Sequence, residues 1–175
     1  MHEEKTIAQT SVTMAQVMLP QDANPAGNIH GGVIMKLIDT AASVVASRHA
    51  QCNTVTASID SMSFHHPVFV GDLLILKASI NMVGRSSMEV GVRVEAEDYI
   101  RGIVRHTASA YLTFVALDEQ GNPASVPQLK LETDGDRRRN LEAERRRSAR
   151  LALRRSEATS QREAVSQREG QRPTT

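Results

Sequence analysis

One long helical pattern precedes four consecutive strand patterns, and this order constrains the fold more than any other feature. Apolar residues recur with the spacing of one helix face at Ile34, Leu37, Ile38, Ala41, Ala42 and Val45. Strands are expected at about 12–19, 55–64, 73–83, 88–96 and 103–117. Short turns join the last four, and short turns connect antiparallel neighbours. The sequence therefore predicts an α+β fold in which one antiparallel sheet wraps around one apolar helix.

The segment 88–96 has the clearest strand pattern. Apolar residues from Met88 to Ala96 alternate with polar ones, among them Glu89 and Arg93. Such alternation is typical of a strand with one face in the core and the other in water. We therefore expect Glu89 and Arg93 to be solvated.

The C-terminal region differs in charge from the rest of the chain. Residues 135–175 hold twelve Arg and six acids, a net charge of +6, whereas the preceding residues carry a net −5. Residues 136–155 contain i,i+4 pairs but few apolar residues, which predicts a solvated, charged helix. Residues 156–175, rich in Ser, Gln, Arg and Glu, are expected to be disordered. The expected division is a domain at 8–120 and an Arg-rich tail at 121–175.

Composition favours a cytoplasmic protein. No apolar run reaches 18 residues, so no membrane span is expected. The N-terminus has no basic stretch followed by an apolar one, as a signal peptide would. Cys52 is the only cysteine and cannot form an intrachain disulfide, which fits a reducing compartment.

The loop before the helix leads directly into Gly31 and Gly32. The first N–H groups of a helix have no intrahelical acceptor, and they lie at the positive end of its dipole. Without a Cβ, the backbone there can approach a substrate oxygen closely. A tight turn into the helix would use the same two glycines, so the pair alone supports both interpretations.

Two polar residues flank this glycine pair. Asp39 lies at the edge of the apolar stripe, about 10 Å along the helix axis from Gly32. A partly desolvated carboxylate there is a better general base, although a solvated surface aspartate has the same pattern. The Asn24 side chain can donate to a carbonyl or hold a water, but it can also close an Asx turn before Pro25.

The segment 84–87 is a second candidate binding region. Arg85 offers a cation, and Ser86 and Ser87 offer hydroxyls next to turn amides, which suit phosphate contacts. Arg93 on the adjoining strand could add charge. An ordinary hairpin with a solvated arginine is the alternative.

Other catalytic patterns are absent. The sequence has no H-E-x-x-H, no G-x-S-x-G and no G-x-x-x-x-G-K-[ST], so it predicts no metal site, serine nucleophile or P-loop. His30, His65 and His66 are therefore left out of the predicted catalytic set.

Several motifs in one order resemble the acyl-CoA hydrolase branch of the hotdog thioesterases. They are Asn24-Pro-Ala-Gly-Asn-Ile-His-Gly-Gly continuing to Asp39, Val55-Thr-Ala-Ser-Ile-Asp60, Phe64-His-His-Pro67, Val70-Gly-Asp72 and Gly84-Arg-Ser-Ser-Met-Glu-Val90. The resemblance covers about residues 8–120 and leaves out the tail. It implies the hotdog fold, with an antiparallel sheet wrapped around one long helix. It also implies dimers of hotdog units that assemble into a hexamer, a trimer of dimers.

The resemblance implies hydrolysis of fatty acyl-CoA to free fatty acid and CoA. Asp39 would be the general base or nucleophile, and Asn24 would orient substrate or water. The Gly31 and Gly32 amides would polarise the thioester carbonyl. Arg85, Ser86, Ser87 and Arg93 would contact the CoA part. No separate cofactor is expected, because CoA belongs to the substrate. In the family the asparagine and the aspartate resemble a catalytic pair from different hotdog units.

Two other functions stay open on the sequence. Hotdog dehydratases and hydratases generally pair a histidine with an acid, and no suitable histidine stands out here. A non-catalytic acyl-CoA sensor with a basic, nucleic-acid-associating tail is the other alternative. Twelve Arg can bind phosphates, but six interspersed acids and the lack of aromatic residues weaken the nucleic-acid case.

Overall fold

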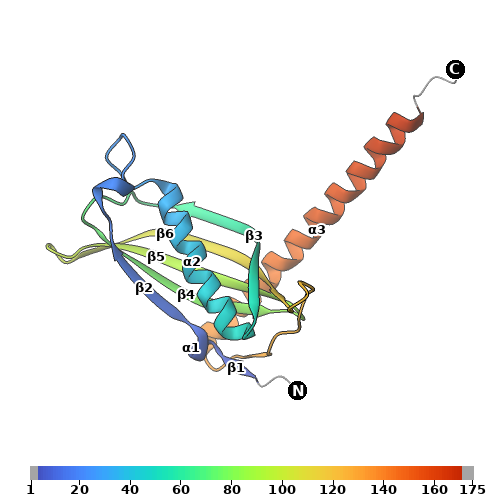
Figure 1. Cartoon of the computed structure of the whole chain (residues 1–175), viewed down its shortest axis with the longest axis horizontal. Helices are drawn as coiled ribbons and strands as arrows, with labels where there is room; N and C mark the ends of the chain where they lie inside the picture. Colours follow the sequence, from blue (N-terminus) through green and yellow to red (C-terminus); the bar gives the residue numbers. More distant parts are fainter. Residues whose placement is uncertain (1–3, 171–175) are drawn as a thin grey trace.

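Helix α2 (Gly31–Ala50) lies across one face of a five-stranded antiparallel sheet (Figure 1). The computed structural model describes residues 4–170. The strands are β2 (Val12–Val17), β3 (Asn53–Phe64), β4 (Leu73–Val83), β5 (Ser87–Asp98) and β6 (Ile103–Leu117). Their spatial order is β2-β4-β5-β6-β3. The expected hotdog arrangement, an antiparallel sheet around one apolar helix, is confirmed.

The core lies between α2 and the inner face of the sheet. The apolar stripe of α2 is buried from Ile34 to Ala46, and inward residues such as Leu76, Val90 and Leu112 are fully buried against it. Each fully buried aliphatic side chain contributes about 1.5–3 kcal/mol. This packing fixes α2 with its N-terminus near the end of β3 and its C-terminus near the start of β3.

Several short elements were not anticipated. Strands β1 (Lys5–Thr6) and β7 (Leu129–Lys130) pair in parallel, α1 (Ile7–Thr10) is a single helical turn, and η1 (Pro20–Asp22) is a 3-10 turn. Elements this short contain too few residues for a periodic pattern. They depend on local side-chain bonds, such as the Thr6–Gln9 capping box that starts α1.

The C-terminal helix is longer than the sequence analysis predicted. Helix α3 (Asp134–Gly170) begins with reciprocal bonds between Thr133 and Asp136 and continues without interruption. The structure has helix as far as Gly170, where the sequence analysis expected disorder from residue 156, and residues 171–175 lie outside the described part. Ala, Glu, Gln and Arg are good helix formers, and neither Gly nor Pro occurs from residue 136 to 169. Within residues 4–170, no helix has the length and apolarity to cross a membrane.

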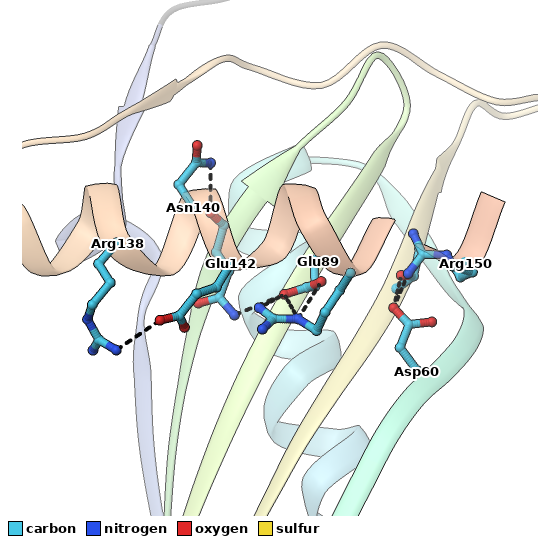
Figure 2. Close-up of polar contacts among 9 residues, drawn as sticks. Asp60, Glu89, Arg138, Asn140, Glu142 and Arg150 are labelled. Atoms are coloured by element: carbon cyan, nitrogen blue, oxygen red, sulfur yellow. Dashed lines mark hydrogen bonds and ion pairs between the residues drawn. The ribbon is translucent and has the colours of Figure 1, made fainter. Parts of the chain in front are cut away.

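The first half of α3 packs on the outer face of the sheet, opposite α2 (Figure 2). Arg146 makes three hydrogen-bond contacts of 2.7–3.3 Å with the Glu89 carboxylate, and its guanidinium stacks 3.8 Å from the Tyr111 ring centre. Arg150 binds Asp60, and Asn140 donates to the Asn81 carbonyl. Two expectations are corrected here: Glu89 is fully buried, and α3 is not a fully solvated helix.

Candidate active site

The loop before α2 is organised by the side chain of Asn24. Its Oδ1 accepts hydrogen bonds from the backbone N–H groups of Ala26 (2.9 Å) and Asn28 (3.3 Å). The Asx turn considered from the sequence is thus present. The amide nitrogen Nδ2 donates to no atom of the residues that the structure describes. Asn24 is therefore held by its oxygen, and its nitrogen is the end that can serve a ligand.

The two glycine amides at the start of α2 differ from each other. His30 is the N-cap, and its Nδ1 accepts from the Gly32 N–H at 2.9 Å. The Gly31 N–H has no acceptor among the atoms that the structure describes. A Cβ at Gly32 would lie 3.1 Å from His30 Nδ1, whereas one at Gly31 would meet only Phe64 at 3.7 Å. Gly32 thus makes room for the His30 cap, and Gly31 carries the free donor.

Asn24 and Gly31 line the same pocket. The pocket has a volume of about 350 Å³ and lies between the loop, the first turn of α2 and the segment after β3. Phe64, His65 and Val68 contribute to its walls. The structure therefore brings together two of the four predicted catalytic residues, with apolar side chains beside them.

Asp39 lies further along α2 and does not line this pocket. Asp39 is eight positions after Gly31 in the helix, which is about 12 Å along the axis. Its half-buried carboxylate accepts a hydrogen bond from the Thr56 hydroxyl, with 2.7 Å between Oγ1 and Oδ1. Thr56 was not among the predicted site residues, although it belongs to the motif at residues 55–60. This contact becomes apparent only from the packing of β3 against α2.

The predicted CoA-binding residues lie elsewhere in the chain. The turn with Arg85, Ser86 and Ser87 is at the end of the sheet away from the start of α2, and Val126 N–H and Ala116 N–H bind its carbonyls. Arg93 is on the outer face of the sheet, where its Nε donates to Glu95 at 2.8 Å. Within one chain, none of the four lies at the pocket of Asn24 and Gly31.

The positively charged Arg93 lowers the pKa of the neighbouring Glu95. The hydrogen bonds from Arg93 and Lys77, partly opposed by desolvation, hold the pKa of Glu95 below its usual value. Arg93 therefore has a carboxylate partner that any bound phosphate must share or displace. Among the side chains that the structure describes, which exclude residues 154, 155 and 157–170, no cluster of three or more His, Cys, Asp or Glu could hold a metal ion.

Comparison with known proteins identifies the class to which this fold and loop belong. A model of the thioesterase superfamily matches residues 26–102. A solved apo-hexameric acyl-CoA thioesterase is 36% identical, with a TM-score of 0.84, over 86% of this chain and 97% of that one. The chain belongs to the thioesterase superfamily, in its branch of hotdog acyl-CoA thioester hydrolases.

Two further relatives are informative. An acyl-CoA hydrolase from Staphylococcus aureus, solved with butyryl coenzyme A, coenzyme A and coenzyme A disulfide, is 35% identical with a TM-score of 0.84, over 93% of this chain and 99% of that one. Other structures of that hydrolase carry alanine in place of one aspartate, one asparagine or one threonine. The cytosolic acyl coenzyme A thioester hydrolase of Rattus norvegicus is 34% identical over 139 residues, 78% of this chain. The chain spans only 36% of that relative's length.

Proposed function

We propose that this protein hydrolyses fatty acyl-CoA thioesters to free fatty acid and CoA. One observation carries the proposal beyond family membership. In the S. aureus hydrolase, the substituted aspartate follows the substituted asparagine by 15 residues and precedes the substituted threonine by 17. Asn24, Asp39 and Thr56 have the same two spacings in this chain. This agreement supports a shared site made of these three side chains.

Asn24 and Gly31 would polarise the thioester carbonyl. Both offer a free N–H group to the same pocket, since the Asn24 oxygen is bound within its own loop. The positive end of α2 adds to the field at that point. One preorganised donor of this kind is worth roughly 3 kcal/mol in the barrier as negative charge develops on the oxygen.

Asp39 would act on the attacking water. Thr56 occupies Oδ1, which fixes the carboxylate and leaves Oδ2 to accept a proton. The water oxygen adds to the carbonyl carbon, and the tetrahedral intermediate then expels the CoA thiolate as the C–S bond breaks. Direct attack by the Asp39 carboxylate is the alternative, with water cleaving the resulting anhydride. Neither route needs a cofactor besides the CoA of the substrate.

The separation along α2 requires a site shared between subunits. A base must come within about 3 Å of its water, yet Asp39 is about 12 Å from Gly31 on the same helix. Asp39 of one chain would therefore serve the pocket of its neighbour. Arg85, Ser86 and Ser87 would reach CoA in the same way, across a subunit boundary. A dimer of hotdog units meets this need, and we propose that three such dimers form a hexamer in the cytoplasm. The hexameric relative supports the hexamer, and the cytosolic relative supports the location.

A chain-length series tests the activity directly. Purified full-length protein is incubated with acyl-CoA from acetyl to palmitoyl, and released CoA is measured with a thiol reagent. We expect saturable, enzyme-dependent release of CoA for at least one fatty acyl chain length. Binding of acyl-CoA without any release of thiol would favour the non-catalytic sensor instead.

A mixing experiment tests the shared site. Asn24→Ala and Asp39→Asn chains should each be inactive as homodimers, but co-expressed mixed dimers should regain about half of the wild-type sites. In each mixed dimer one site collects both lesions and the other has neither. Differently tagged chains allow the mixed species to be purified and its kcat measured. If verified mixed dimers remain as inactive as both parents, Asp39 does not serve the neighbouring pocket.

A further inference from the structure

A cavity of about 320 Å³ lies between α3 and the outer face of the sheet. Strands β4, β5 and β6 form its floor, and the turns of α3 from Arg138 to Arg146 form its wall. The sheet separates it from α2 and hence from Asn24 and Asp39 of the same chain. Its size is at the lower end for pockets that bind small molecules.

Cations dominate the lining of this cavity. Lys77 and Arg93 come from the sheet, Arg138, Arg139 and Arg146 come from α3, and Glu142 is the one acid that lines it among the described residues. Lys77 Nζ and Arg93 Nε share a single carboxylate, that of Glu95, at 2.7 and 2.8 Å. The two cations on the floor of the cavity are therefore neutralised by only one carboxylate, and the remaining positive charge favours binding of an anion.

Two buried polar atoms at the cavity lack partners. Asn81 is only 2% exposed; its Nδ2 donates to Glu89, but its Oδ1 accepts from no described residue. Arg139 binds Asp136 through one terminal nitrogen, while its buried Nε has no acceptor among the described side chains and backbone. Buried polar groups are almost always hydrogen-bonded. A ligand that offers both an anionic oxygen and a donor group would satisfy the two atoms.

The hollow depends on Gly91 in the floor. A Cβ at Gly91 would lie 2.6 Å from Asn81 Nδ2, so any other residue would displace the Asn81 side chain. The register irregularity between Ile80 and Met82 places Asn81 at this point of β4. Gly91 and the register irregularity together keep the unpaired Asn81 Oδ1 accessible as an acceptor under α3.

We propose that this cavity binds a small phosphate ester with free hydroxyl groups. Its phosphate would lie among Lys77, Arg93 and the arginines of α3, and a hydroxyl would donate to Asn81 Oδ1. Such a ligand touches both the sheet and α3, so it would also hold the helix on the sheet. The ester can be a free sugar phosphate or the phosphorylated ribose of a CoA molecule bound apart from the catalytic pocket.

Equilibrium binding and hydrogen exchange on the full chain test this site. Ribose 5-phosphate, CoA and inorganic pyrophosphate are the probes. We expect saturable binding of a phosphate ester, with slower amide exchange in residues 136–150. Lys77→Ala should weaken this binding about tenfold, the usual effect of losing one charge-assisted contact. Arg101→Ala removes an equally positive but exposed side chain from the β5–β6 turn and should bind as the wild type does.

The probes separate the possible sources of the phosphate. Binding of ribose 5-phosphate that Lys77→Ala weakens assigns the site to free phosphate esters. Protection of α3 by CoA alone, again sensitive to Lys77→Ala, assigns it to a second CoA. Pyrophosphate binding as tightly as both esters contradicts a role for Asn81. The proposal also fails if Lys77→Ala and Arg101→Ala behave alike with every probe. Binding and hydrogen exchange do not depend on thioester hydrolysis, so these results test the cavity independently of the thioesterase proposal.

Discussion

Replacing Asp39 by Asn should lower kcat about 10²- to 10⁴-fold while leaving the protein folded. An amide cannot take the proton of the attacking water. Its oxygen can still accept the hydrogen bond from Thr56, so the contact between α2 and β3 remains. Steady-state hydrolysis of the best acyl-CoA substrate gives kcat, and thermal unfolding of the same sample reports the fold.

Asp118→Asn is the matched control for this change. The Asp118 carboxylate accepts from the N–H groups of Gln120 and Asn122 in a surface turn, and an amide oxygen keeps both bonds. We expect wild-type kcat from this variant. A folded Asp39→Asn protein that turns over as fast as the control would remove Asp39 from the mechanism.

Replacing Arg146 by Ala should destabilise the protein by about 3 kcal/mol. Glu89 is fully buried, and the change would leave its carboxylate without the cation that neutralises it. Burial opposes the guanidinium charge, but the hydrogen bonds and the attraction to Glu89 outweigh it and raise the pKa of Arg146. This loss of about 3 kcal/mol lies at the low end for buried ion pairs. The Arg146 side chain is 24% exposed, so water can enter the space that its removal leaves beside Glu89. Urea unfolding measures the loss.

A second arginine on the same helix provides the comparison. Arg137 pairs with Asp134, whose side chain is 98% exposed, so Arg137→Ala should cost less than about 1 kcal/mol. Adding Glu89→Gln to Arg146→Ala should recover part of the stability, because no buried charge is then left unpaired. Equal effects of Arg146→Ala and Arg137→Ala would show that the buried pair does not secure α3.

The sheet and the central helix could be predicted because periodicity determines both. The strand expected at residues 73–83 has those bounds in the structure. Five of the six stripe residues from Ile34 to Val45 are buried as their spacing indicates, and Leu37 is half-buried. These patterns depend on neighbours a few residues apart. The sequence shows such neighbours directly.

The burial of Glu89 could not be predicted for the opposite reason. Its partner Arg146 is 57 residues away, and an alternating Glu is normally solvated. A bond between distant polar residues leaves no periodic signal. The end of α3 was missed because polar composition alone indicates both a charged helix and disorder.

Some features of the candidate site could likewise be predicted from the sequence, and others could not. The loop of Asn24 and the first turn of α2 are adjacent in sequence, and the structure brings them to one pocket. The difference between Gly31 and Gly32 depends on the ring of His30, and the contact of Thr56 with Asp39 depends on how β3 packs. Neither can be read from residue types alone.

The polar outer face of the sheet has an evolutionary consequence. Under α3 the sheet presents mainly hydrophilic side chains, including Lys77, Ser79, Arg93 and Ser109. Most of its apolar side chains face α2, and the buried Met82, which pairs with Glu89, is the exception. A descendant that lost the whole helix would expose a surface that water can solvate, and Glu89 would then be hydrated rather than stranded. Selection can therefore lengthen, recharge or discard α3 with little risk of aggregation. The same freedom does not extend to the buried stripe of α2, where a substitution alters the core.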